Sequence, residues 1–122
     1  MTVERITPEL DRIVDRGQDV EELGRGYVAG EGPVWWREGG YLLFSDYRAS
    51  RRFKWDAKSG VTLVKEPTHE GNGQTRDQKG RLIVCERQAR RVVRYEADGE
   101  PTVMAARYQG RRLNKQIGRA HV

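Results

Sequence analysis

Short runs of apolar residues, each closed by a polar turn, recur along this chain between residues 31 and 105. The runs are rich in Val, Leu and aromatic residues, which suit a pleated, half-buried surface. The turns between them are 37–40, 57–60, 77–80 and 97–99, which hold glycine and charged residues. Turn signals at a spacing of about ten residues predict an all-β fold of short strands.

The pattern also repeats at a fixed offset, which the paired turn glycines Gly40 and Gly80 set at 80 − 40 = 40. Three segments of one unit align with three of the next: 39–46 with 79–86, 53–56 with 93–96, and 62–64 with 102–104. A period near 40 with four short strands per unit is the signature of a β-propeller blade. We therefore predict a partial β-propeller of about two four-stranded blades in residues 27–115.

Residues 1–26 predict a short N-terminal helix and an extended arm. Thr7 is a candidate N-cap, and Pro8 suits the first helical position. An apolar stripe at helical spacing then follows, made of Leu10, Ile13 and Val14. We expect Gly17 to end this helix.

The segment 30–36 (GEGPVWW) places one carboxylate between two glycines at the start of a strand. Asn72 opens the first strand of the next unit at nearly the same offset from Glu31, since 72 − 31 = 41. The first strand of each propeller blade lines the central channel, so both side chains are expected to face the channel mouth. A carboxylate there suits a hard metal ion. The alternative is that both are solvated turn residues, since Asn-Gly is a common turn pair.

Composition and charge narrow the range of functions. The 122 residues make roughly one small domain. A net charge of +5 permits an acidic partner, but the basic residues are scattered among Asp and Glu, and no nucleic-acid motif is present. The N-terminal residues have no apolar core of the signal-peptide type, and the sequence contains no apolar run of about 18 residues. We expect a cytoplasmic protein that binds neither nucleic acid nor membrane, and the oligomeric state stays open.

Four stretches of the chain resemble the SMP-30/gluconolactonase/luciferin-regenerating-like family. They are EGPVWWREGGYLLFSD (31–46), NGQTRDQKGRLIVCE (72–86), RRVVRYEADG (90–99) and YQGRRLN (108–114). The chain departs from the family pattern at Gln74, where Leu is usual and packing near the channel is expected to be weaker. It departs again at Arg87, where a histidine often follows Cys-Glu.

The resemblance implies a six-bladed propeller that hydrolyses small lactones, often sugar lactones, and binds one divalent cation, calcium or zinc. Glu31 would be the first metal ligand, and Asn72 would lie near the substrate. The next ligand would come from a Pro-Asn-Asp motif after Arg-Leu-Asn, and a later aspartate would be the last ligand and the catalytic base. No catalytic residue is therefore expected within this chain. We predict that these 122 residues have no lactonase activity, although the full-length parent would.

Residues 116–122 (QIGRAHV) do not continue the family pattern. They look like a translated DNA-sequencing adapter, because the adapter bases ATC GGA AGA GCA CAC GTC encode Ile-Gly-Arg-Ala-His-Val. We interpret these residues as a non-native tail of a truncated gene, in which His121 is not a biological residue. Reading the locus past the Lys115 codon tests this hypothesis, and a native stop after Val122 would contradict it.

Two other functions stay open from the residues alone. The chain could belong to a non-catalytic propeller-type binding module, or it could be a small, self-contained all-β protein. Two open blades are expected to leave apolar residues without neighbours, because repeat units need stacked partners. These residues are Val34, Leu43, Val84 and Val103.

The remaining candidate residues have structural interpretations. Cys85, the only cysteine, excludes an internal disulfide and is expected to be a small core residue, since no Cys-His constellation surrounds it. We expect His69 to be a solvated loop residue. Asp46 and Glu86, at matching positions, are expected to be structural. The tryptophans at 35, 36 and 55 are expected to pack the blades.

Overall fold

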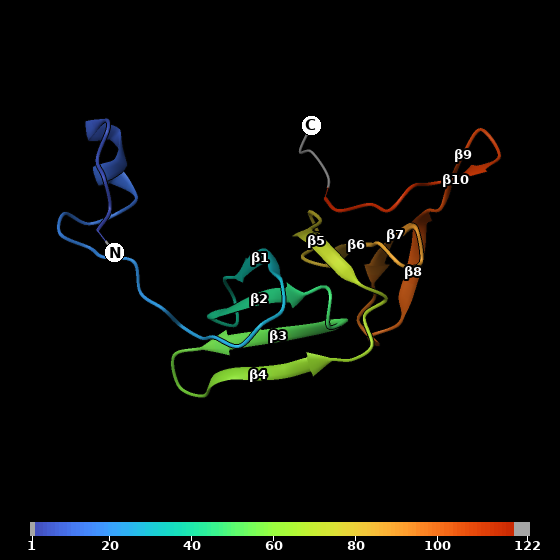
Figure 1. Ribbon diagram of the computed structural model, residues 1–122, viewed down its shortest axis with the longest axis horizontal. Coiled ribbons are helices and arrows are strands. Elements are labelled where there is room, and N and C mark those ends of the chain that lie inside the picture. The colour runs from blue at the N-terminus through green and yellow to red at the C-terminus, as the bar shows by residue number, and fades with distance from the viewer. Residues whose placement is uncertain (1, 119–122) are drawn as a thin grey trace.

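The computed structural model describes residues 2–118, which form two four-stranded antiparallel sheets and one short helix (Figure 1). Blade 1 consists of β1 (Gly30–Trp36), β2 (Tyr41–Asp46), β3 (Arg51–Asp56) and β4 (Gly60–Lys65). Blade 2 consists of β5 (Gly71–Arg76), β6 (Leu82–Glu86), β7 (Arg91–Tyr95) and β8 (Pro101–Ala105). Each sheet keeps its strands in sequence order. The prediction of an all-β fold with two four-stranded blades is confirmed.

The two blades share their irregularities as well as their strands. A β-bulge follows Arg52 where β3 pairs with β4, and a matching bulge follows Val92 where β7 pairs with β8. Ser50 and Arg90 both adopt a left-handed backbone, with φ of 56° and 55°. Both pairs keep the offset found in the sequence, so the repeat extends to backbone conformations that few side chains favour.

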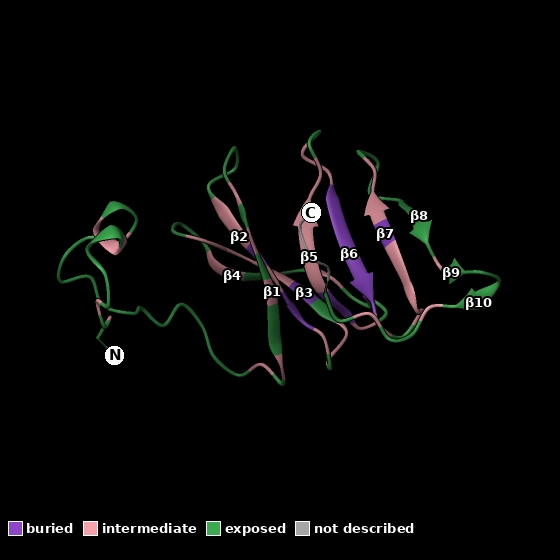
Figure 2. Ribbon diagram, turned by 90° about the horizontal axis from the view of Figure 1, so that it is seen from above, coloured by how far each residue is buried: buried purple, intermediate pink, exposed green. Residues whose placement is uncertain are grey.

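The hydrophobic core lies between the blades. Leu43 of β2 packs with Leu82, Val84 and Val93 of blade 2, and Val84 and Val93 are fully buried. Figure 2 shows β6 as a strand that is buried along its whole length. The expectation that Leu43 and Val84 lack neighbours is therefore wrong, because the sheet faces that carry them lie against each other. Val103, by contrast, is 49% exposed.

The opposite face of blade 1 is only partly covered, by the segment that leads into β1. The Tyr27 ring meets the Phe44 ring edge-on, with 5.0 Å between their centroids, and lies 5.2 Å from the Phe53 ring. Trp35 and Leu63 on the same sheet stay about half exposed. This face therefore keeps apolar surface that the described residues do not cover.

The predicted N-terminal helix is shorter than expected. It is a five-residue 3-10 helix, η1 (Pro8–Arg12), with no buried residue. Thr7 precedes it in extended backbone, but its side chain makes no capping hydrogen bond. The helix ends before Gly17, since a turn with no buried face gains little from packing. No helix in the described part of the chain is long and apolar enough to cross a membrane.

Candidate functional site

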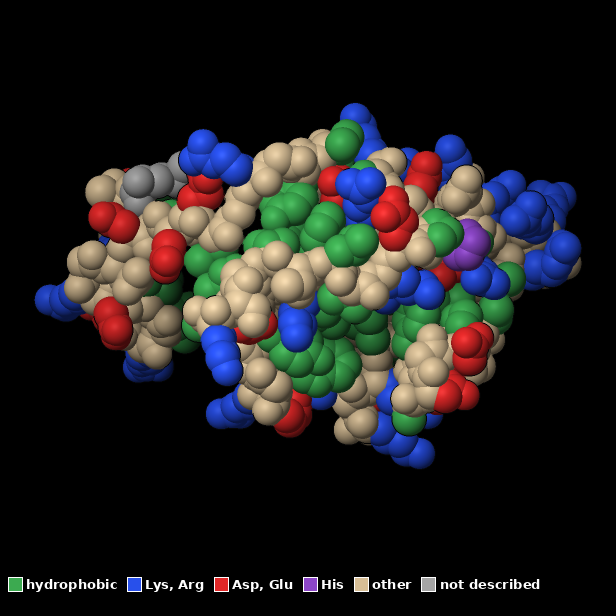
Figure 3. Space-filling view, turned by 90° about the horizontal axis from the view of Figure 1, so that it is seen from below, with side chains coloured by type: hydrophobic (Ala, Val, Ile, Leu, Met, Phe, Trp, Pro, Cys, Tyr) green, Lys and Arg blue, Asp and Glu red, His purple; other side chains and the backbone are tan. Residues whose placement is uncertain are grey.

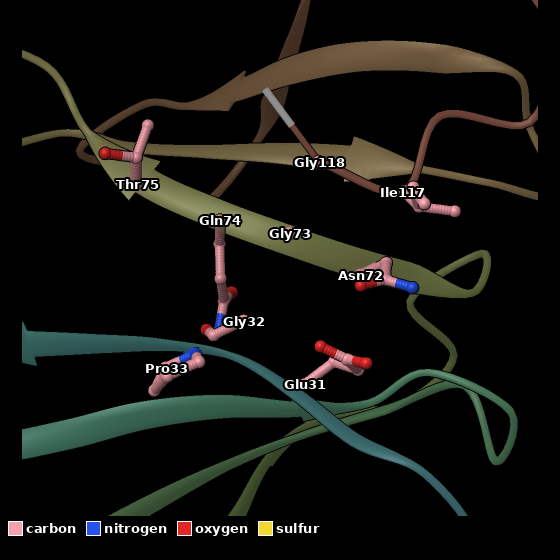
Figure 4. Close-up of a pocket in the computed structure, with 9 residues that line it drawn as sticks. All are labelled: Glu31, Gly32, Pro33, Asn72, Gly73, Gln74, Thr75, Ile117 and Gly118. Carbon is pink, nitrogen blue, oxygen red and sulfur yellow. The ribbon is translucent and has the colours of Figure 1, made fainter. Parts of the chain in front are cut away.

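A pocket of about 370 Å³ opens where β1 and β5, the first strands of the two blades, approach each other (Figure 4). Both site residues predicted from the sequence, Glu31 and Asn72, line it. The other lining residues come from the same two strands and from the C-terminal segment: Gly32, Pro33, Gly73, Gln74, Thr75, Ile117 and Gly118.

Glu31 and Asn72 point into the same gap between the strands (Figure 4). Glu31 is exposed, and its carboxylate makes no hydrogen bond or ion pair with any residue that the structure describes. Asn72 is 6% exposed. The site thus combines a free carboxylate at its mouth with a buried amide in its wall.

Gly32 allows the two strands to come this close. Its φ is 59°, and a Cβ at this position would lie 2.3 Å from the backbone carbonyl oxygen of Asn72. The hydroxyl of Ser45 donates a hydrogen bond of 3.1 Å to the same carbonyl oxygen. Glycine is therefore required here by close backbone approach, whereas Gly30 faces open space.

Gln74 connects the blades across the pocket. Its Nε2 donates a 2.8 Å hydrogen bond to the carbonyl oxygen of Gly32, and its Oε1 is buried without a partner among the described residues. At this departure from the family pattern, Gln74 thus forms a directed hydrogen bond between β5 and β1. The expected loss of packing there stays a prediction.

The C-terminal segment enters the pocket at a third equivalent place. The backbone N–H of Gly73 donates to the carbonyl oxygen of Ile117 at 2.9 Å. Gly73 matches Gly32 in the preceding blade, at the same offset that relates Asn72 to Glu31 (73 − 32 = 41). A Cβ on Gly73 would lie 2.7 Å from the Ile117 oxygen, much as one on Gly32 would approach the oxygen of Asn72. Glu31, Asn72 and Ile117 thus hold equivalent positions around the pocket, which we call its first, second and third stations. The side chain at the third station is aliphatic.

These donors do not complete a metal site. Glu31 offers one carboxylate and Asn72 one amide oxygen, whereas calcium takes about six to eight oxygen ligands and zinc about four ligands. Within residues 2–118, no group of three or more His, Cys, Asp and Glu side chains could hold a metal ion. The residues present do not by themselves fit the cation that the family resemblance implies.

Asp46 and Glu86 are structural, as predicted. Both are buried, with 3% and 0% exposure. The Asp46 carboxylate accepts hydrogen bonds from the backbone N–H groups of Val28 and Ala29, at 3.0 and 2.8 Å. Glu86 accepts a 2.6 Å bond from the Arg91 guanidinium. The first carboxylate fixes the segment that enters β1, and the second joins β6 to β7.

The other candidates lie away from the pocket. Cys85 is 1% exposed in β6, so it is a core residue, as predicted. His69 is exposed in the loop before β5 and does not line the pocket. His121, assigned from the sequence to a non-native tail, lies outside the described residues.

The part of the chain that contains this site is similar to a known protein family. A family model described as the SMP-30/Gluconolactonase/LRE-like region matches residues 29–117. A gluconolactonase of Zymomonas mobilis is 26% identical over 126 residues, which cover 92% of this chain and 35% of that protein.

Two solved structures are also similar. An X-ray structure of a protein classed by family as a gluconolactonase has a TM-score of 0.83 and 29% identity, covering 93% of this chain and 39% of that one. A gluconolactonase of Xanthomonas campestris has a TM-score of 0.73 and 32% identity, covering 79% of this chain and 32% of that one. The chain thus spans about a third of the length of these relatives.

Proposed function

This chain belongs to the SMP-30/gluconolactonase/LRE-like family, and we propose that the complete protein hydrolyses small lactones, with sugar lactones as its substrate class. The observation that carries the proposal is the placement of Glu31 and Asn72. They are far apart in sequence yet face one pocket from the first strands of successive blades. Relatives named gluconolactonase support the same reaction class.

In this proposal Asn72 binds the substrate. Its amide carries both donors and an acceptor, which suits the hydroxyl groups of a sugar lactone. The buried position of Asn72 and the Ser45 hydrogen bond to its backbone support a fixed orientation. Gly32 and Gln74 hold the neighbouring backbone of β1 in place, and thereby the Glu31 carboxylate across the gap.

We further propose that the complete protein binds one divalent cation, calcium or zinc, with Glu31 among its ligands. Glu31 would hold such an ion together with ligands from elsewhere in the complete protein, and the ion would supply Lewis-acid polarisation of a lactone carbonyl. The other ligands and the base must come from residues that this chain does not contain, since the side chain of Ile117 supplies no ligand at the third station. The 122 residues alone are therefore expected to be inactive.

The test is gluconolactone hydrolysis, measured above the spontaneous rate for the present chain and for the complete protein. The present chain should match a metal-free control, and the complete protein should hydrolyse the lactone. In the complete protein, Glu31→Gln should lower kcat/KM by about a hundredfold, the effect of losing roughly 2.7 kcal/mol of transition-state stabilisation. Glu100→Gln, at an exposed turn away from the pocket, is the matched control.

Two outcomes would contradict the proposal. Robust hydrolysis by the present chain would show that the missing ligands are not needed. A complete protein that binds the lactone but leaves it intact would favour the alternative, a non-catalytic propeller-type binding module.

A further inference from the structure

The N-terminal segment folds on itself and lies at one end of the molecule, apart from both blades (Figures 1 and 2). A β-bridge joins Thr2 to Asp19, and the Arg5 guanidinium binds the Asp11 carboxylate inside the loop that this bridge closes. Ile6 and Ile13 are 86% and 81% exposed. The segment thus has internal contacts of its own but keeps uncovered apolar side chains.

This segment, which we call the acidic arm (residues 2–22), is also negatively charged. It contains seven Asp and Glu residues and three Arg residues, so its net charge is 3 − 7 = −4. Within the described chain, ion pairs engage Asp11 and Glu22. The other five carboxylates form none there: Glu4, Glu9, Asp15, Asp19 and Glu21.

The opposite end of the molecule carries the opposite charge. The hairpin of β9 (Arg107–Tyr108) and β10 (Arg111–Arg112), with its flanking residues, forms what we call the basic hairpin (residues 101–118). It contains four Lys and Arg residues and no Asp or Glu, so its net charge is +4. Figure 3 shows Lys and Arg side chains gathered at this end. Its members form no ion pair within the described chain.

The basic hairpin also has apolar surface. Tyr108 is 71% exposed, and Val103 and Met104 are about half exposed. Charge and exposed apolar side chains therefore occur together on both segments, with complementary signs. Because the two segments lie at opposite ends of the molecule, one copy cannot bring its own arm to its own hairpin (Figure 1).

We propose that the acidic arm of one copy docks on the basic hairpin of a second copy, and that two antiparallel copies exchange this contact reciprocally in a dimer. Opposite potentials steer such surfaces together, and burial of Ile6, Ile13 and Tyr108 adds apolar contact. A two-fold axis would make both contacts equivalent and close the assembly, so the proposal predicts a defined dimer rather than a filament.

Salt distinguishes this dimer from association through the open sheet faces. Screening shortens the reach of exposed charges to about 10 Å at 0.1 M salt and about 3 Å at 1 M. The arm–hairpin dimer should therefore dissociate as salt rises. Contact through the apolar face that carries Trp35 and Leu63 should persist or strengthen, because apolar burial does not depend on charge.

The experiment is sedimentation equilibrium of the full chain, whose monomer mass is 14.1 kDa, over a concentration series at about 0.1 M and about 1 M salt. Two charge-reversed variants use residues whose side chains make no hydrogen bond or ion pair in the described chain. One is R111E/K115E in the hairpin, and the other is E4K/D15K in the arm. Circular dichroism checks that each variant folds like the parent chain.

We expect a salt-sensitive dimer of the parent chain and at least about tenfold weaker dimerisation of each variant alone, a loss of about 1.4 kcal/mol. An equimolar mixture of the two variants should dimerise more tightly than either variant alone, because the unaltered arm of the hairpin variant (net charge −4) then meets the unaltered hairpin of the arm variant (+4). The two substituted segments, each with net charge zero (−4 + 4 and 4 − 4), meet at the other contact. R37E/K58E, which lowers the net charge by 4 as R111E/K115E does but at exposed turns of blade 1, should dimerise like the parent chain. A monomeric parent, a salt-insensitive assembly, or a mixture that stays monomeric would overturn the proposal.

Discussion

At the scale of single residues, the close approach of neighbouring backbone segments at two glycines determines where the candidate site lies. Gly32 and Gly73 each face the carbonyl oxygen of a residue in the next unit, at distances that leave no room for a side chain. This contact draws the first strands together and brings Glu31 and Asn72 to one pocket. The site thus depends on two glycines, Gly32 and Gly73, which have no side chain that could bind a ligand.

The first prediction concerns Gly32. Its replacement by alanine imposes a left-handed backbone on a non-glycine residue, which costs roughly 1–2 kcal/mol, and drives a Cβ into a backbone oxygen, which adds roughly 1–3 kcal/mol. Gly40→Ala is the matched control, because its φ of 62° is similar but no atom lies within 4 Å of the new Cβ. Urea denaturation should show the larger loss for Gly32→Ala. Equal losses would mean that the close approach is not a constraint.

A second prediction concerns the third station of the pocket. Ile117→Asp places a second carboxylate beside Glu31 and Asn72, so we expect Ca²⁺ affinity to rise by at least about tenfold, equivalent to about 1.4 kcal/mol. Calorimetric titration measures this. Ile13→Asp, at an exposed position in the arm, controls for added negative charge. The gain should disappear in the double variant with Glu31→Gln, and a gain that survives there would show that the two positions do not share an ion.

A third prediction concerns pH and the turn between β5 and β6. Hydrogen bonds from the Arg81 backbone N–H, the Arg81 guanidinium and the Lys79 backbone N–H hold the pKa of Asp77 below its ordinary value of 3.8. Because the folded pKa lies below the unfolded one, the stabilisation is complete above about pH 4 and is lost as pH falls through the folded value.

Carbon-detected NMR titration of the Asp77 carboxyl group measures this shift directly. Arg81→Ala should raise the pKa only partly, because the largest contribution comes from a backbone N–H that the substitution keeps. A midpoint at or above 3.8 in the parent chain would contradict the turn geometry.

At the scale of elements, the sheets are held together by a core that both blades supply. Leu43 is the blade 1 residue in the cluster of buried hydrophobic side chains, and its partners Leu82, Val84 and Val93 come from β6 and β7. Arg76 of β5 also lies over the Trp36 ring of β1, with 4.0 Å between its guanidinium carbon and the ring centroid. Neither sheet can bury its inner face without the other.

The fourth prediction follows from this shared core. Leu43→Ala should lower the free energy of unfolding by roughly 2–5 kcal/mol, the usual range for a buried leucine. Hydrogen exchange should speed up in β6 and β7 as well as in β2, because the cavity opens between the blades. Leu63→Ala, at a position 52% exposed, should have a small and local effect. Loss of protection confined to blade 1 would show that the blades unfold independently.

The sequence predicted the blades well because strand alternation and turn residues are local signals. The repeat offset located both sheets, and even the bulges after Arg52 and Val92 obey it. The third station was not predictable in this way. The spacing from Asn72 to Ile117 is 117 − 72 = 45, because the β9–β10 hairpin adds residues that break the period. The burial of Leu43 and Val84 depends on how the two sheets pack against each other. The pattern of residues along one strand holds no information about that packing.

At the scale of the whole molecule, the described chain has one closed interface and several open surfaces. The blades bury their facing sides, while the outer face of blade 1 and both terminal segments stay uncovered. This distribution matches a chain that spans about a third of its relatives' length. The uncovered surfaces are where the remaining blades of a propeller, or a second copy, would be accommodated.

The shared core between the blades also has a consequence for synthesis of the protein. All of its members lie between Leu43 and Val93, and the strands that present them end at Tyr95. A nascent chain can assemble this core once these strands have left the ribosome, before the residues that follow Tyr95 are needed. Folding in order from the N-terminus during translation therefore lets the two blades pack against each other early in synthesis.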